Sequence, residues 1–317
     1  MAKAWETIER SLELDDRFDQ THMIAGDAWL RETEMVGQQL AAKQQELATA
    51  EGEAKAAIEA EIAQLQEEQD RKLEEAITSY ERALEINPSL MNVYVTVAGA
   101  YEQLGRIDEA IATLENAAIA NPKSGDPYIG LAELYQRNNN PEAAVEAYRQ
   151  AIALKPNDVN YRLTLASLLE SLGRLNEALI EVQEAARLKP EDPSLRQSLA
   201  FMYEQLQMYP EALAEAQVAA QLAPNDTTTQ LLMGDVSRML NNLPTAAEAY
   251  ERALAIDPNL ENAWNVHLNL ALIYQGLGQL DLALTHATAA LSGAPETQRE
   301  QISDFVAQVE TQSSGNP

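Results

Sequence analysis

Cysteine is absent from this 317-residue sequence, and histidine, phenylalanine and tryptophan occur only three times each. Without cysteine there are neither disulfide bonds nor thiolate metal sites, so cysteine usage does not reveal the redox compartment. The three histidines, His22, His267 and His286, lie far apart in the sequence, and none has a second histidine at metal-ligand spacing. We therefore expect no metal site and no bound cofactor.

Positive charge is also scarce. The chain has 50 acidic and 22 basic residues, which gives a formal net charge of −28 at pH 7. A field of this sign repels nucleic acid and anionic lipid, and it favours neutral or basic partners. We expect partners that are proteins or peptides, and the acidity also serves to keep a many-helix surface soluble.

Long hydrophobic runs and catalytic motifs are missing as well. No apolar run reaches the roughly 18 residues of a transmembrane helix, and no signal peptide is visible. Gly276 and Gly278 fit a turn between two helices better than a phosphate-binding loop, and no catalytic constellation is present. We expect a non-enzymatic protein that does not insert into a membrane by this segment. The expected location is the cytoplasm, with membrane attachment through an upstream segment as an alternative.

A strict period dominates what is present. Successive prolines stand 34 residues apart five times in a row: Pro88, Pro122, Pro156, Pro190, Pro224 and Pro258. A fixed period of this length indicates one supersecondary unit that repeats along an axis.

Other positions repeat with the prolines. A small residue stands ten residues after each of the first five prolines, and alanine stands 22 and 29 residues after each of them. Small residues let two helices approach closely, and apolar residues three and four apart on both sides of a break indicate two amphipathic helices per unit. The small residues are Ala98, Ala132, Ala166, Ala200 and Gly234; the alanines are Ala110, Ala144, Ala178, Ala212 and Ala246, then Ala117, Ala151, Ala185, Ala219 and Ala253.

This pattern resembles the tetratricopeptide repeat family in its bacterial form. The resemblance rests on the period, on the small, aromatic, alanine and proline positions, and on runs such as Tyr80–Pro88 and Tyr250–Pro258. Leu169 and Ser237 depart from the family at the aromatic position. The resemblance implies an all-α, right-handed superhelix whose concave groove is lined by the first helix of each unit and holds a peptide or a partner helix.

The chain begins and ends irregularly. Residues 1–18 align with the end of a unit, with Asp16 in the proline's place, which suggests that the natural protein extends upstream. Within residues 19–90, about 34–71 are inserted and helical by composition. We interpret the insert as an antiparallel coiled-coil hairpin and as a second contact site or homodimerisation arm. One long helix or a disordered linker is the alternative.

The remaining boundaries follow from the period. Regular units are expected over 91–124, 125–158, 159–192, 193–226 and 227–260, then a unit with three extra residues over 261–297, a capping helix over 298–310 and a disordered tail over 311–317.

The resemblance also implies groove residues. The position seven residues after each proline should face the groove, and positions 11 and 14 should lie one and two turns further along the same helix. The candidate partner-binding residues are Val95, Ile129, Leu163, Gln197, Leu231 and Leu268 along an apolar floor, with Phe201 beside them and Glu102, Glu170 and Glu204 along an acidic edge. Packing between helices is the competing interpretation of Val95, Ile129 and Leu163.

The function expected from this sequence is a protein-interaction scaffold or adaptor. Two alternatives remain open. One is an assembly factor for a multi-subunit membrane complex, including a photosynthetic one. The other is the interaction domain of a larger enzyme or membrane-anchored protein.

Overall fold

The computed structural model describes residues 2–14 and 16–315, and within these ranges it contains sixteen α-helices and no strand. The all-α repeat architecture predicted from the proline period is confirmed. Residues up to Tyr161 form one compact unit, and residues from Arg162 onward form a second.

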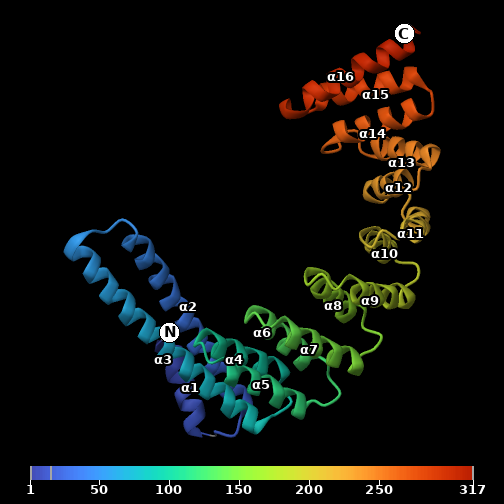
Figure 1. The fold of residues 1–317 in the computed structure, drawn as a ribbon. Coiled ribbons are helices and arrows are strands. Elements are labelled where there is room, and N and C mark those ends of the chain that lie inside the picture. The colour runs from blue at the N-terminus through green and yellow to red at the C-terminus, as the bar shows by residue number, and fades with distance from the viewer. Residues whose placement is uncertain (1, 15, 316–317) are drawn as a thin grey trace. The chain divides into compact units, whose positions relative to one another are not determined.

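The first unit consists mainly of helix pairs that follow one another along the chain (Figure 1). Its helices are α1 (Ala2–Leu14), α2 (Asp19–Leu47), α3 (Gly52–Ile86), α4 (Met91–Gln103), α5 (Ile107–Ala120), α6 (Asp126–Arg137), α7 (Pro141–Leu154) and the start of α8 (Val159–Ser171). The expected half repeat over 1–18 includes residues 1 and 15, which lie outside the described residues. Ile8 of α1 is buried against Ala25 and Ala28 of α2.

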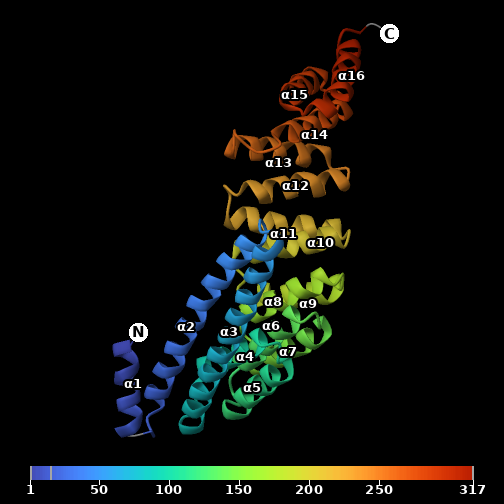
Figure 2. The ribbon, with the colours of Figure 1, turned by 90° about the vertical axis from the view of Figure 1, so that its left-hand side faces the viewer.

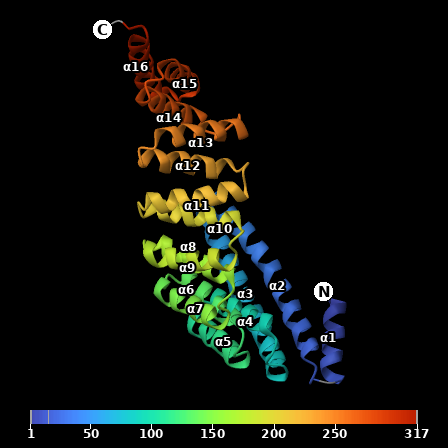
Figure 3. The same ribbon diagram turned by 90° about the vertical axis from the view of Figure 1, so that its right-hand side faces the viewer.

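The second unit continues the same alternation, and Figures 2 and 3 show α10 to α13 as successive layers. Its helices are the rest of α8, then α9 (Leu175–Leu188), α10 (Pro193–Gln205), α11 (Tyr209–Leu222), α12 (Thr227–Met239), α13 (Leu243–Ile256), α14 (Ala263–Gly276), α15 (Leu280–Gly293) and α16 (Glu296–Ser313).

The recurring alanines form the close contacts between helices. All ten alanines that stand 22 and 29 residues after the prolines are fully buried. Ala76, Ala83, Ala283 and Ala290, which hold the same positions in the irregular units, are equally buried. A methyl group at these positions lets neighbouring helix backbones come close enough for the larger side chains to interlock beside them.

The turn inside each unit uses one left-handed residue at a fixed position. Gly105, Gly173 and Gly278 have φ near +71°, as glycine permits, and Asn139, Gln207 and Asn241 have φ between 56° and 59°. The amide after each of them donates to a carbonyl five residues earlier, as in Arg106 N to Tyr101 O at 2.9 Å. This bond closes the first helix and directs the chain back along it.

The helices α2 and α3 are the longest of the described residues, with 29 and 35 residues. They lie side by side and project beyond α1 and α4 (Figures 1 and 2). Ion pairs Glu32–Lys72 and Lys43–Glu61, at 2.6 and 2.7 Å, join them in antiparallel order. Val36 of α2 and Ile58 of α3 are buried. That this segment is a repeat insertion with coiled-coil packing stays a prediction.

The C-terminal region differs slightly from the expectation. Pro258 and α14 are separated by a longer turn with Asn262 in the left-handed region, and this turn absorbs part of the three extra residues. The last helix continues to Ser313, beyond the expected end at 310. Gln275 Nε2 donates to Gln312 Oε1 at 2.9 Å and Ser313 Oγ bonds Asp281 at 3.3 Å, which holds the final turn of α16 against α14 and α15. Residues 316–317 of the expected tail lie outside the described residues.

Candidate interaction surfaces

A cavity of about 450 Å³ opens between α8 and α10. Leu163, Phe201 and Glu170, three of the candidate groove residues, line it together, and Val182 of α9 contributes to its wall. Leu163 and Phe201 are half-buried, whereas Glu170 is exposed. The cavity therefore combines apolar surface with a carboxylate at its margin, which suits a side chain that is partly apolar and partly polar.

The cavity also contains residues that the sequence analysis did not select. Ser198, Met202 and Gln205 line it from α10, and Gln205 Nε2 donates to Glu170 Oε1 at 2.5 Å. Each of these three stands one residue after a candidate position on the same helix. The signal is present in the sequence, since Ser198, Met202 and Gln205 are spaced by four and three residues and therefore share one face of the helix.

Glu204 stands one turn after Phe201 on α10 and is half-buried. Burial raises the pKa of its carboxyl, and the nearby carboxylate of Asp235 raises it further. Asp235 accepts a hydrogen bond from Tyr250 at 2.6 Å, whereas among the described residues no hydrogen bond or ion pair reaches the carboxylate of Glu204. Glu204 is therefore an acidic group whose charge a cationic partner would stabilise.

Other candidates in the second unit have partners within the protein. Gln197 Nε2 donates to Asp226 at 2.6 Å and to Thr229 at 2.9 Å, which ties α10 to the start of α12. Leu231 packs against the buried cluster around Tyr250, and Leu268 packs against the cluster that contains Ile302. Their assignment to partner binding stays a prediction.

In the first unit, the apolar candidates are accessible and the acidic one is neutralised. Val95 is 49% exposed and Ile129 is half-buried. Glu102 accepts hydrogen bonds from Arg137 Nε and Nη2 at 3.0 and 2.9 Å, and a third from Asn138 at 3.2 Å. Because this arginine satisfies both carboxylate oxygens, Glu102 has little residual charge to offer a ligand.

Two histidines that are distant in sequence meet in the fold. His267 of α14 and His286 of α15 approach to 3.0 Å between their Nδ1 atoms, and Tyr274 stacks on His286. Burial lowers the pKa of both rings, and the neighbouring His267 lowers that of His286 further, with Glu251 opposing. One ring donates and the other accepts, so the pair is stable only while at least one ring is neutral.

Acidification should therefore destabilise the second unit through this pair. Because the folded-state pKa values lie below the ordinary value of about 6.5, the unfolded chain binds more protons below that pH. The contribution is complete above about pH 6.5 and is lost as the pH falls. We expect the urea midpoint to fall less between about pH 7 and pH 5 in His286→Gln than in the wild type. In His22→Gln the urea midpoint should change with pH as it does in the wild type. An equal change of the midpoint with pH in all three proteins would contradict the expectation.

The described residues contain neither a cluster that could hold a metal ion nor a helix that could span a membrane. Within 2–14 and 16–315, no three His, Cys, Asp or Glu side chains are grouped so as to hold a metal ion. No helix in that part of the chain combines the length and the apolar character that crossing a bilayer requires.

Comparison with known proteins identifies the repeat. Residues 68–124 and 129–193 match two family models, both described as tetratricopeptide repeat. No curated protein sequence matches the chain.

Among solved structures, MamA is 20% identical with a TM-score of 0.48, over 56% of this chain and 94% of MamA. PilF of Pseudomonas aeruginosa is 21% identical with a TM-score of 0.46, over 69% of this chain and 97% of PilF. YrrB, described as a TPR protein with an unusual peptide-binding site, is 19% identical with a TM-score of 0.46, over 57% of this chain and 93% of YrrB. The two family matches, together with the paired helices at the predicted period, identify residues 68–124 and 129–193 as tetratricopeptide repeats.

Proposed function

We propose that the protein is a non-catalytic interaction scaffold that binds a peptide or helix of a partner protein at the cavity between α8 and α10. One observation carries the proposal. Leu163, Phe201 and Glu170 are groove positions that the family resemblance implies, and all three line that one cavity. Residues that only pack two helices would not be expected to border open space together.

The chemistry of the cavity favours a ligand that is apolar at one point and neutral or basic beside it. Burial of an aliphatic or aromatic side chain against Leu163 and Phe201 contributes about 25 cal/mol per Å² of apolar surface. Glu170 and Glu204 attract lysine or arginine and repel acidic ligands, and such charges affect the association rate more than the affinity.

Leu163→Glu is expected to lower ligand affinity by about tenfold or more, because it replaces apolar contact surface with a charge, and about 1.4 kcal/mol suffices for a tenfold change. Dodecapeptides selected from a phage library on the wild-type chain would be measured by fluorescence anisotropy on both proteins. Leu222→Glu is the matched control, since Leu222 is 40% exposed on α11 and does not line the cavity. Selected peptides that bind all three proteins equally would show that this cavity is not the site.

The acidic residues are tested separately. Glu170→Gln combined with Glu204→Gln should slow the association of basic peptides and flatten its dependence on salt, while dissociation changes less. Surface-plasmon kinetics at low and high salt measure both quantities. An association rate with unchanged salt dependence would assign the steering to other carboxylates of this acidic chain.

A further inference from the structure

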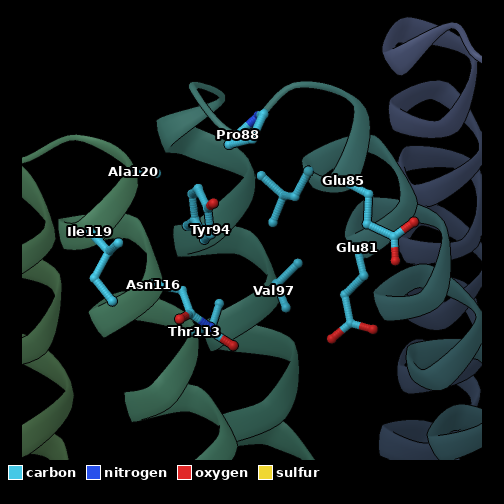
Figure 4. Close-up of a pocket in the computed structure, with 10 residues that line it drawn as sticks. Glu81, Glu85, Pro88, Tyr94, Val97, Thr113, Asn116, Ile119 and Ala120 are labelled. Carbon is cyan, nitrogen blue, oxygen red and sulfur yellow. The ribbon is translucent and has the colours of Figure 1, made fainter.

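Another cavity, of about 460 Å³, lies in the first unit. None of the candidate groove residues is among the described residues that line it. It lies between α3 and α5, the second helices of consecutive units, with α4 as its floor. Figure 4 shows Glu81 and Glu85 of α3 on one side, Asn116 and Ile119 of α5 on the other, and Tyr94 between them. It therefore opens on the face of the repeats opposite to the predicted groove.

Two side chains of this cavity offer contacts to a ligand. Ile119 is 77% exposed, the highest value among the large hydrophobic side chains in the described part of the chain. The ring of Tyr94 is largely buried, and burial raises the pKa of its hydroxyl. Ser237 Oγ is the one buried side-chain oxygen without a partner among the described residues, so the Tyr94 hydroxyl is open to solvent and a polar group of a ligand can reach it.

The charge of the cavity is of one sign. Glu81 and Glu85 stand one helical turn apart on α3, and both are exposed. Glu81 accepts a hydrogen bond from Tyr101 at 2.7 Å, and Glu85 pairs with Arg82 at 2.6 Å. No lysine, arginine or histidine lines the cavity. A ligand that carries phosphate or carboxylate would be repelled here, and so would a second copy of a chain with net charge −28.

The same repeat positions form a cavity of about 300 Å³ in the second unit, between α11 and α13 over α12, with different chemistry. The residues that correspond to Glu81, Glu85, Tyr94 and Asn116 are there Gln217, Gln221, Gln230 and Arg252. The repeat fold thus provides the hollow, and its side chains decide the ligand. Of these two cavities, the one in the first unit has carboxylates and no basic side chain among the described residues that line it, whereas Arg252 lines the other.

We propose that the cavity between α3 and α5 is a second docking site, for a basic amphipathic segment of a partner protein. An aliphatic side chain of that segment packs on Val97, Tyr94 and Ile119. A lysine or arginine within one turn of it pairs with Glu81 and Glu85. A backbone carbonyl of the segment accepts the hydrogen bond that Tyr94 has to give. The site is independent of the cavity between α8 and α10.

The test uses three fluorescein-labelled pentadecapeptides that form amphipathic helices. The first carries leucine and lysine, the second has glutamate in place of each lysine, and the third has alanine in place of each leucine. Fluorescence anisotropy with the full chain should show binding of the first peptide at least about tenfold tighter than of the others, since both charge and apolar burial contribute. Equal affinities for all three would overturn the proposal.

Variants assign the binding to a cavity. Ile119→Arg should weaken the leucine–lysine peptide by about tenfold or more, because it adds like charge and removes the apolar wall. Ile180→Arg, on the exposed surface of α9, is the matched control and should bind as the wild type does. If Leu163→Glu weakens this peptide and Ile119→Arg does not, the proposal fails while the site between α8 and α10 stands. Sedimentation could instead show concentration-dependent dimers of the wild type that Ile119→Arg abolishes. The cavity would then bind a second copy of this chain and not a partner protein, and the proposal would be overturned.

Two further variants test the roles of individual groups. Tyr94→Phe keeps the ring and removes a hydroxyl that is open to solvent, so its thermal midpoint should stay close to that of the wild type while peptide affinity falls by roughly two- to tenfold. Glu81→Gln with Glu85→Gln should lower the affinity and flatten its dependence on salt. Tyr94→Phe with unaltered affinity, together with an unaltered salt dependence in the double variant, would contradict both roles.

Discussion

Gly234→Ala is expected to destabilise the second unit by about 2–3 kcal/mol, although alanine normally favours a helix. A Cβ atom at Gly234 of α12 would lie 2.6 Å from two ring atoms of Tyr250. Tyr250 is 1% exposed, and its hydroxyl donates to Asp235 at 2.6 Å. The ring cannot retreat without weakening a hydrogen bond to a carboxylate, which adds to the overpacking cost.

Gly99→Ala in α4 is the matched control. A Cβ atom at Gly99 meets no other atom within 4 Å, so alanine should stabilise the protein by about 0.5–1 kcal/mol through helix propensity. Gly26→Ala should behave like Gly234→Ala, because its Cβ would lie 2.7 Å from the ring of Tyr80. The midpoints of urea denaturation, followed by circular dichroism, compare the three. Gly234→Ala with a midpoint as high as that of Gly99→Ala would contradict the packing described here.

The same contact explains what the period could predict about the fold. A small residue is required ten residues after each proline, and Ala132, Ala200 and Gly234 all meet that requirement. A Cβ atom at Gly234 would lie 2.6 Å from the ring of Tyr250 in the second helix of the same unit. The unit 125–158 has Tyr148 at the position of Tyr250 and yet has Ala132 at that of Gly234. The repeat therefore fixes that this residue must be small, while the position of the facing ring decides whether a methyl group fits.

The turns were predictable where their chemistry is local. Gly105 and Gly173 mark breaks in the sequence and adopt positive φ. Gln207 adopts φ of 59° at the equivalent position without any such signal. Left-handed backbone costs a residue with a side chain about 1–2 kcal/mol, so the packing of α10 against α11 must hold this turn.

The candidate site was predictable only in part, because the period describes each position without its neighbours. Leu163 and Phe201 border one cavity, and their role in partner binding stays a prediction. Gln197 holds the same repeat position as Leu163, yet Asp226 and Thr229 at the start of α12 bind its amide. Polar residues that occur once, such as Thr229, follow no period. Their effect on neighbouring groove positions appears only when the helices are assembled.

Lys72→Met is expected to destabilise the first unit by about 2 kcal/mol, within the range for a hydrogen bond to a charged group. Lys72 of α3 is 8% exposed, and its Nζ lies 2.6 Å from Glu32 of α2. Trp5 of α1 donates to the other oxygen of Glu32 at 2.6 Å. Removal of the lysine leaves a partly buried carboxylate without a cation, and the loss stays below that of a fully buried pair because Trp5 still donates to it.

Three comparisons make this expectation specific. Lys43→Met is the control, since Lys43 joins the same two helices but its side chain is 33% exposed, and exposed pairs contribute about 1 kcal/mol or less. Lys72→Met with Glu32→Gln should recover part of the lost stability, because the neutral amide still accepts from Trp5.

The hydrogen bond from Lys72, followed by that from Trp5, lowers the pKa of Glu32. Its stabilisation is therefore complete above the ordinary carboxyl pKa of about 4.5 and is lost as the pH falls through the lower, folded value. Urea midpoints at neutral and acidic pH should converge for wild type and Lys72→Met as Glu32 becomes protonated, and a difference that persists unchanged in acid would rule out the ion pair as its source.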